Sequence, residues 1–385
     1  MSSRPADPST HPDDASPGGG LRPTSAFGIA ATFIGTTIGA GYASGQEILQ
    51  YFVSFGPLGG TGALLIAGTL FFLLCVIVLR LAQRLRTTDI HRIVNPTTSR
   101  IPTVFADVCI TASLLGTLVI MLAGAGTALH SALGWPPLLG AALMAAACVV
   151  SVLAGISGLV RVQGVIVPMI IVVAVAVAAW GLLNPGPAVD DVASLVNSSP
   201  MIDHWWVSGL LYVAFNVQLA YAVLAPIGQE SSSSPRTLAT GAALGAGGLV
   251  VMAGAIMAAM TAHAQLIGRA DLPMVELAGT IGAWAAVVYT AVLLMAQFTT
   301  AVSCLYGGVA RLGALAPLHP VPAGAIAVAT AAGATLLSSV GFSDLIGVVY
   351  PVLGYAGLVI ILMLLATWLF ERRAVRRRNA ATAVD

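Results

Sequence analysis

The sequence predicts an all-α integral membrane protein with ten transmembrane helices, arranged as two five-helix halves of opposite orientation. Of its 385 residues, 58% are hydrophobic and 8% are charged, and the mean hydropathy of +0.94 lies far above that of soluble domains. Ten apolar stretches each reach the roughly 20 residues that cross a bilayer. The first of them carries four glycines and a carboxylate between Gly35 and Glu47, which is unusual for a spanning helix.

The ten apolar stretches are separated by connections rich in Gly, Pro, Ser, Asp or Arg. They lie at Ala26–Phe52, Leu58–Leu85, Val104–Leu129, Leu138–Gly155, Gly164–Leu183, Trp205–Ile227, Leu238–Ala262, Ala278–Val309, Val321–Leu337 and Leu345–Phe370. An odd number of helices per half gives the two halves opposite orientations, as in inverted-repeat transporters. We therefore divide the chain into a flexible N-terminal tail (1–24), a ten-helix domain (25–370; repeat one 25–183, repeat two 205–370) and a basic C-terminal tail (371–385).

Charge sets the predicted orientation. The chain has no lysine, and with the N-terminus in the cytoplasm only Arg269 of its 16 arginines falls on the outer side. The long outer connection between the fifth and sixth helices carries Asp190, Asp191 and Asp203 and no arginine. Basic residues favour the cytoplasmic side, so the sequence predicts that both tails are cytoplasmic.

The glycine-rich segment of the first helix indicates a break in that helix at membrane depth. Gly39-Ala40-Gly41 gives the backbone freedom, and Tyr42 and Ser44 follow directly. Exposed backbone groups at such depth occur where they face a cavity or a ligand. The alternative is close helix packing, because Gly35-x3-Gly39 and Gly41-x3-Gly45 also fit the small-xxx-small pattern.

The sixth helix is the second candidate for a substrate-binding segment. Asn216 and Gln218 lie at its centre and should face the protein interior. A break near Asn216 is compatible with this polarity, but the helix has no central glycine or proline, so a continuous helix is the alternative. Tyr212 and Phe215 either line the substrate cavity or serve only in packing. The predicted substrate-binding residues are Gly39, Ala40, Gly41, Tyr42, Ser44, Tyr212, Phe215 and Asn216.

These two segments carry a family resemblance. The run from Gly35 to Phe52, and Tyr212–Asn216 with Ala222–Pro226, resemble the YkvI-like bacterial membrane proteins. More distantly, the chain is similar to the amino acid/polyamine/organocation permeases and sodium symporters that share the LeuT-type 5+5 inverted repeat. The resemblance spans all ten helices and implies this fold, but a fold does not identify a substrate.

The resemblance also implies one sodium site. In sodium-coupled members of the superfamily, carbonyls of the first helix join a carbonyl and two hydroxyls of the eighth. Here these would be the carbonyls of Gly35, Ile38 and Ala296 and the hydroxyls of Thr299 and Thr300, five hard oxygens suited to a hard cation. The alternative is that both threonines only bond their own helix. Tyr42 replaces the asparagine of a second site, which argues against a second sodium.

Glu47 stands near the end of the first apolar stretch with no arginine close in sequence. An isolated charge in hydrocarbon costs several kcal/mol. Three roles are open for this carboxyl: a coupling proton site, an outer gate, or a hydrogen bond between helices.

The sequence therefore predicts a secondary active transporter that moves a small, amino-acid-like solute with sodium, or with protons. A passive channel and a non-transporting sensor on the same fold are the alternatives. No H-E-x-x-H or G-x-S-x-G motif occurs, and we predict no enzyme activity, no resident cofactor and no nucleic-acid partner. The expected partners are the lipid bilayer and the solute; the sequence leaves the oligomeric state open.

Overall fold

The computed structural model of the chain describes residues 25–87, 93–95, 99–155, 159–196, 198–315 and 322–381. The predicted N-terminal tail lies outside these residues. The main helices are α1 (Ala26–Thr37), α2 (Ala40–Ser44), α3 (Gln46–Tyr51), α4 (Gly56–Leu85), α6 (Arg100–Leu133), α7 (Pro137–Ala154), α8 (Leu159–Leu183), α9 (Trp205–Glu230), α10 (Pro235–Ala262), α11 (Ala264–Ile267), α12 (Pro273–Gly279), α13 (Ala283–Leu315), α14 (Ala323–Leu337) and α15 (Phe342–Ala381). Two 3₁₀ turns, Val53–Phe55 and Ser338–Val340, join α3 to α4 and α14 to α15.

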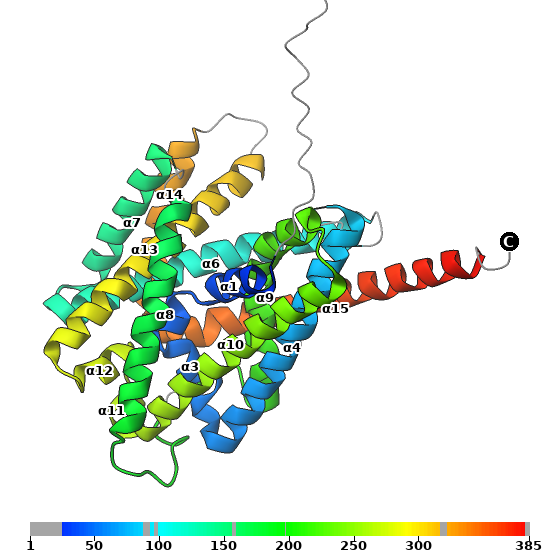
Figure 1. Cartoon of the computed structure of the whole chain (residues 1–385). Helices are drawn as coiled ribbons and strands as arrows, with labels where there is room; N and C mark the ends of the chain where they lie inside the picture. The colour runs from blue at the N-terminus through cyan, green and yellow to red at the C-terminus, as the bar shows by residue number, and fades with distance from the viewer. Residues whose placement is uncertain are drawn as a thin grey trace, which may run out of the picture.

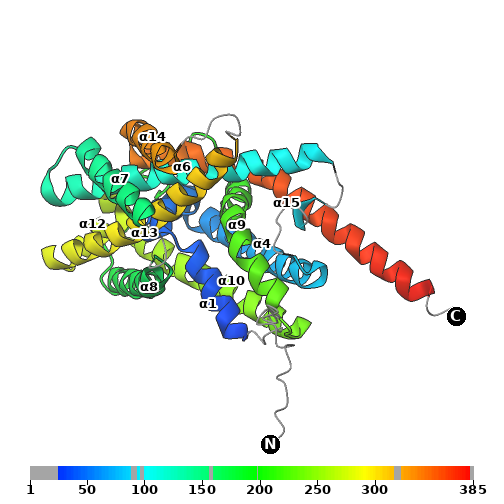
Figure 2. The same cartoon turned by 90° about the horizontal axis from the view of Figure 1, so that it is seen from above.

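The helices pack in two groups. One contains α1, α4, α9 and α10, and the other contains α6, α7, α13 and α14. Two helices connect the groups: α8 packs on α10 and α13, and α15 packs on α9 and α6. In both views α7 and α14 lie on one side, while the end of α15 reaches out on the opposite side (Figures 1 and 2). Each half of the chain thus supplies two helices to each group and one connecting helix.

The first helix is divided in the middle. α1 ends at Thr37, Ile38 and Gly39 are extended, and α2 begins at Ala40. The Gly39 N–H donates to the Thr37 carbonyl at 3.0 Å, so it does not close a helical turn on the Gly35 carbonyl. The hydroxyls of Thr32, Thr36 and Thr37 also bond carbonyls four residues back, an interaction that bends helices. The backbone therefore leaves the helix at the predicted segment.

A second turn follows at Gly45, between α2 and α3. Its φ of 84° lies in the left-handed region, which favours glycine. A Cβ at this position would also lie 2.7 Å from Met274 of α12. Gly45 therefore redirects the chain within the membrane fold and lets α12 approach.

The sixth spanning segment does not break at Asn216. α9 is helical there, and the Asn216 amide donates to the Tyr212 carbonyl four residues back at 2.9 Å. The bend lies further on, where Trp205–Tyr221 and Val223–Gln229 meet at 55°. Pro226 lies four residues after this point and removes a helical hydrogen bond to it. The chain does not break at Asn216, because it is helical there and the side-chain amide of Asn216 bonds a carbonyl of the same helix.

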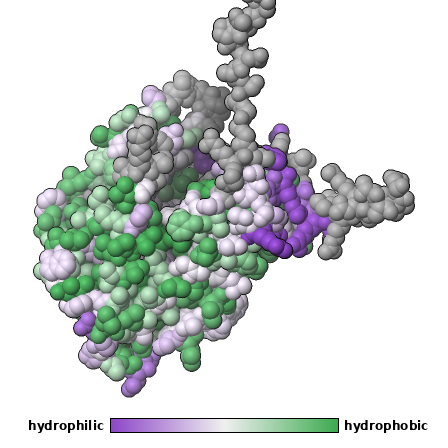
Figure 3. Space-filling view, in the orientation of Figure 1, coloured by the Kyte–Doolittle hydropathy of each residue, from purple (hydrophilic) through white to green (hydrophobic). Residues whose placement is uncertain are grey.

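The surface is that of a membrane protein. Within the described residues, eight stretches are long and apolar enough to span a bilayer, and the bent α9 would make a ninth. α1 has only 12 residues, so the count of ten spans stays a prediction. Apolar side chains cover most of the face seen in Figure 3, and hydrophilic ones gather where α15 leaves the bundle. The exposed arginines there are Arg84, Arg86, Arg372 and Arg373.

The last helix extends beyond the predicted end of the ten-helix domain. α15 continues to Ala381, beyond the limit at residue 370. The eighth apolar stretch, predicted from Ala278, is helical as α13 only from Ala283, and Glu276 belongs to the short helix α12 before it.

Candidate functional site

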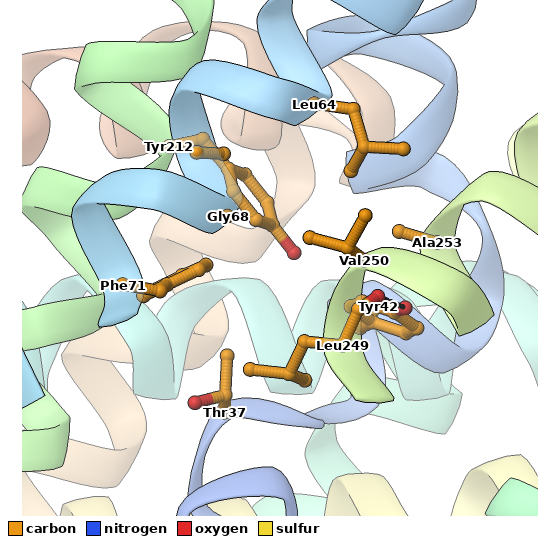
Figure 4. Close-up of a pocket in the computed structure, with 10 residues that line it drawn as sticks. Thr37, Tyr42, Leu64, Gly68, Phe71, Tyr212, Leu249, Val250 and Ala253 are labelled. Atoms are coloured by element: carbon orange, nitrogen blue, oxygen red, sulfur yellow. Dashed lines mark hydrogen bonds between the residues drawn. The ribbon is translucent and has the colours of Figure 1, made fainter. Parts of the chain in front are cut away.

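A small cavity lies beside the break in the first helix. It is lined by Thr37, Tyr42, Leu64, Ala67, Gly68, Phe71, Tyr212, Leu249, Val250 and Ala253, and its volume is about 10 Å³. Figure 4 shows these side chains converging from several helices, with the Tyr212 hydroxyl pointing into the space between them. This volume holds about one water. The cavity therefore has no room for an organic solute in this conformation.

Tyr42, Phe71 and Tyr212 are the aromatic residues that line this cavity, and further aromatic rings pack behind Tyr212. Tyr212 packs at ring-centroid distances of 4.9 Å on Phe52, 5.4 Å on Tyr51 and 6.0 Å on Phe71. Phe215 continues the cluster at 5.5 Å from Tyr212 and stacks on Tyr350 of α15 at 4.4 Å. Tyr42 reaches across to α10, where its hydroxyl donates to the Leu249 carbonyl at 3.2 Å. The structure thus brings the predicted residues Tyr42, Tyr212 and Phe215 to one place.

Glu47 lies next to the break, folded back onto α2. An ideal Cβ on Gly41 would lie 2.0 Å from Glu47 Oε1, so the carboxyl occupies the space that the glycine leaves. Glu47 is 4% exposed, and its Oε2 has no hydrogen-bond partner. Two predicted residues six positions apart therefore contact each other directly, and this contact requires the turn at Gly45.

The other predicted substrate-binding residues differ in what they contact. Ser44 donates to the Gly41 carbonyl at 2.8 Å and stabilises α2. Ala40 is buried. Gly39 is half-buried, and a Cβ there would meet nothing within 4 Å. Asn216 bonds its own helix. Thr37, Phe71 and the α10 residues Leu249 and Val250 were not predicted, because apolar residues facing a cavity have the same sequence pattern as core residues.

Three of the five predicted sodium ligands lie together on α13. The hydroxyls of Thr299 and Thr300 both donate to the Ala296 carbonyl, each at 3.0 Å. Donation uses the hydroxyl hydrogen and leaves the oxygen of Thr300 able to accept or to coordinate. On α1, the break releases the Gly35 carbonyl from its helical partner, and Ile38 is extended and buried.

A polar contact that the sequence analysis missed joins α3 to the start of α15. Gln46 Nε2 donates to Ser343 Oγ at 2.5 Å, and Gln50 Nε2 donates to the Ser343 carbonyl at 2.9 Å. Gln46 is completely buried and Gln50 is 3% exposed. We call these three residues the α3–α15 latch. The spacing of four between the two glutamines places them on one helix face, but nothing in the sequence identifies their partner.

Further polar side chains connect the helix groups. Gln218 of α9 donates to the Leu353 carbonyl of α15 at 2.8 Å and accepts from Ser113 of α6 at 2.9 Å. Asp107 of α6 pairs with Arg311 of α13 at 3.0 Å. The polar side chain of Gln218, which was predicted to face the protein interior, therefore holds α6, α9 and α15 together.

At the predicted outer side, the connection between α11 and α12 approaches α15. Burial raises the pKa of Asp271 above its usual range, and the nearby carboxylate of Asp344 raises it further. Both residues keep exposed surface. When Asp271 and Asp344 are both ionised, their repulsion makes the approach of the α11–α12 connection to α15 less favourable.

Comparison with known sequences identifies two relatives. The chain is 28% identical to the uncharacterized membrane protein YkvI of Bacillus subtilis (strain 168), over 92% of this chain and 98% of YkvI. It is 26% identical to YyaD of the same organism, over 86% of this chain and 94% of YyaD. No protein-family model matches the chain.

Comparison with solved structures identifies the fold. The inward-facing conformation of Mhp1 has a TM-score of 0.65 at 18% identity, over 92% of this chain and 80% of Mhp1. A Na⁺-coupled sialic acid symporter scores 0.55 at 14% identity, over 84% of this chain and 74% of that one. MhsT in complex with L-phenylalanine scores 0.55 at 17% identity, over 90% and 88%.

The solved structures that share this fold are transporters and not enzymes. Both relatives match over nearly their whole length, which confirms the resemblance seen in the first and sixth helices. The chain is therefore a multi-pass membrane protein, homologous to YkvI and YyaD, with the fold of the LeuT-type transporters.

Proposed function

We propose that the protein is a secondary active transporter of the bacterial cytoplasmic membrane, which imports a small amino-acid-like solute together with sodium. The observation that carries this proposal is the division of the first helix at Ile38 and Gly39, inside a fold whose solved neighbours are transporters. A break at this depth is useful only where its backbone groups face an ion, a solute or water.

The two helix groups support alternating access. Each half of the chain contributes equivalent helices to both groups, as expected if one group moves against the other around a fixed site. The cavity between α1, α4, α9 and α10 is nearly closed, at about 10 Å³. We assign this conformation to the occluded ones, in which the substrate site is collapsed.

Sodium is the favoured coupling ion. The Ala296 carbonyl and the hydroxyls of Thr299 and Thr300 lie within one turn of α13, where both hydroxyls at present bond that carbonyl, and the break frees a carbonyl on α1. One sodium ion entering across about 100 mV contributes roughly 2.3 kcal/mol, and a tenfold gradient adds about 1.4 kcal/mol. Together they support roughly 500-fold accumulation of a neutral solute, so one ion is sufficient.

Uptake into proteoliposomes tests this proposal. Solutes that raise the unfolding temperature are first selected by a thermal screen and then offered with a sodium gradient. Thr300→Ala should raise the sodium concentration for half-maximal uptake about tenfold, because it removes one hydroxyl ligand. Thr335→Ala is the matched control: Thr335 makes the same bond to its own helix, at 2.8 Å to Ala331, but on α14.

Three results would count against the proposal. Uptake that only equilibrates the solute would indicate a passive pore. Concentrative uptake driven by a pH gradient without sodium would replace sodium by protons, with Glu47 as the first candidate carrier. Equal effects of the two threonine variants would remove Thr300 from the ion site.

A further inference from the structure

Glu47 is a buried acid for which the protein supplies no counter-charge. Its Oε1 packs against Gly41, and its Oε2 is unpartnered although the residue is 4% exposed. Among the described residues, no arginine or histidine pairs with it. A carboxylate in this position is strongly disfavoured unless a cation or a proton joins it.

The groups that face Glu47 are tyrosines from four elements. Tyr42 of α2, Tyr51 of α3, Tyr212 of α9 and Tyr350 of α15 all lie within electrostatic range of its carboxyl. The side chains of α10 and α12 nearest to Gly45 are the thioethers of Met260 and Met274, and Tyr289 of α13 donates its hydroxyl to the Ala43 carbonyl. The surroundings are therefore aromatic and polarisable, with hydroxyls but no positive charge.

A carboxylate inside an aromatic wall is complementary to an ammonium group. The carboxylate neutralises the charge, while ring faces attract the cation and cover its alkyl part. Tyr212 connects the two features, because its ring lines the cavity and its buried hydroxyl lies close to the Glu47 carboxyl, although the contact does not complete a hydrogen bond. A solute without an ammonium group would leave the carboxylate unpaired.

We propose that Glu47 binds the protonated amino group of the transported solute, and that it holds a proton when the solute is absent. This inference rests on the proposed transport function and names the chemical group that the site selects. When R–NH3⁺ binds, the carboxylic acid releases its proton and the carboxylate pairs with the ammonium. One cation thus replaces another, and the net charge of the site does not change.

Two consequences follow from this exchange. Protons and amines compete for one carboxyl, so the affinity for the amine falls as the solution becomes more acidic. The amine also needs more room than the cavity of about 10 Å³ provides, so its binding must be accompanied by movement of α2 and α3 away from the aromatic wall. Gly41 is required for this binding site, because any side chain at that position would displace the Glu47 carboxyl.

Thermal unfolding of the full-length protein tests the inference. The probes are primary alkylammonium ions from ethylammonium to benzylammonium, each compared with the alcohol of the same carbon skeleton, at constant ionic strength. At least one ammonium should raise the unfolding midpoint by about 2–5 °C near pH 8, and less near pH 6, while its alcohol has no effect. These amines stay protonated at both pH values, because amines of this type titrate near 10.

Variants connect the effect to Glu47. Glu47→Gln should abolish the stabilisation at both pH values, and Glu47→Asp, which keeps the charge on a shorter side chain, should retain part of it. Glu276→Gln, the same change on the exposed surface of α12, should behave as wild type. If Glu47→Gln does not fold, Glu47→Asp with an unchanged amine response and pH dependence would contradict the inference.

The outcomes separate this inference from the proposed function. If no ammonium ion stabilises the protein, or if ammonium and alcohol act equally, Glu47 does not select amines. Sodium-driven uptake of a solute without an amino group, unaffected by Glu47→Gln, would preserve the transport function and overturn the inference. If Thr300→Ala loses sodium coupling but keeps the response to amines, the role of Glu47 in amine binding is supported independently of the sodium site.

Discussion

At the scale of single residues, the glycines of the first helix do different things. Gly45 needs its backbone freedom, since its φ is 84°. Gly41 lies in a helical turn and is needed for space, because the Glu47 carboxyl fills the position of a side chain. Gly39 has open space around it. Sequence spacing alone does not separate these roles.

Gly41→Ala should abolish transport while the protein still inserts. The new methyl would lie 2.0 Å from Glu47 Oε1, and overpacking of this kind costs about 1–3 kcal/mol. Gly39→Ala is the matched control, because its methyl meets nothing within 4 Å, and it should keep most activity. Solute uptake normalised to the amount of folded protein measures both. Equal activity of the two variants would show that the contact of Gly41 with Glu47 has no role.

At the scale of elements, the α3–α15 latch holds the outer half of the first helix against the start of α15. The hydrogen bonds from Gln46 and Gln50 to Ser343 join residues that are 297 and 293 positions apart in the sequence. The turn at Gly45, wedged by Met274 and Met260, closes the same region from α12 and α10. In the proposed transport cycle, these contacts separate when the site opens to the side predicted to be external.

Ser343→Ala should favour the outward-open state. Loss of the hydroxyl leaves the Gln46 amide unsatisfied, and an unsatisfied buried group costs about 1–3 kcal/mol. A cysteine introduced at the buried Ala43 reports opening, because the four native cysteines are all buried. Its labelling by an impermeant maleimide from outside should accelerate about tenfold. Ser339→Ala is the control, since Ser339 bonds only the adjacent Leu336 carbonyl; an equal rate in both variants would contradict the latch.

The outer connection should respond to pH through Asp271. Its pKa is raised in the folded protein by burial and by Asp344. A carboxyl of this kind holds its proton more tightly in the folded state, so its stabilising contribution is present in acid and is lost as pH rises through the folded-state pKa.

Asp271→Asn should therefore be more stable than wild type near pH 7, and the difference should shrink near pH 4. The unfolding midpoint across this range measures the effect. Asp203→Asn, a change of the same type at an exposed outer residue, serves as control. A stability difference that grows on acidification would show that the pKa of Asp271 is lowered instead.

At the scale of the whole molecule, charge and tryptophan positions describe how the protein would lie in a bilayer. The exposed arginines of α4 and α15 cluster at one end. Trp135, Trp180, Trp205, Trp206 and Trp284 are exposed at helix ends or connections on the side predicted to be external. Tryptophan favours both membrane interfaces and arginine favours the cytoplasmic side, so the tryptophans mark one interface and the arginines alone support the predicted orientation.

Both termini should be cytoplasmic. A fluorescent protein fused to the C-terminus should fluoresce, and an enzyme reporter that works only in the periplasm should stay inactive there. Replacing Arg84, Arg86, Arg372 and Arg373 by glutamine should reduce this preference, whereas Arg269→Gln should not. A periplasmic C-terminus in the wild type would overturn the topology and the inverted repeat with it.

The sequence by itself determined the membrane class, the positions of most helices and the division of the first helix. Each of these depends on local properties. The length of each apolar stretch sets the spanning segments, and glycines together with threonines decide where the backbone hydrogen bonds of a helix are interrupted. The family resemblance came from the same segment, so the strongest local signal also led to the fold.

Only the tertiary structure decided which residues meet. Asn216 looked like a break because it is polar, but its side-chain amide bonds its own helix, and the bend lies further on, between Tyr221 and Val223. Ser343 becomes the partner of Gln46 and Gln50 only when α15 packs on α3. The contact between Gly41 and Glu47 depends on the turn at Gly45. Local patterns fix where a helix runs or breaks, whereas contacts between distant residues depend on how whole helices pack, which no single segment encodes.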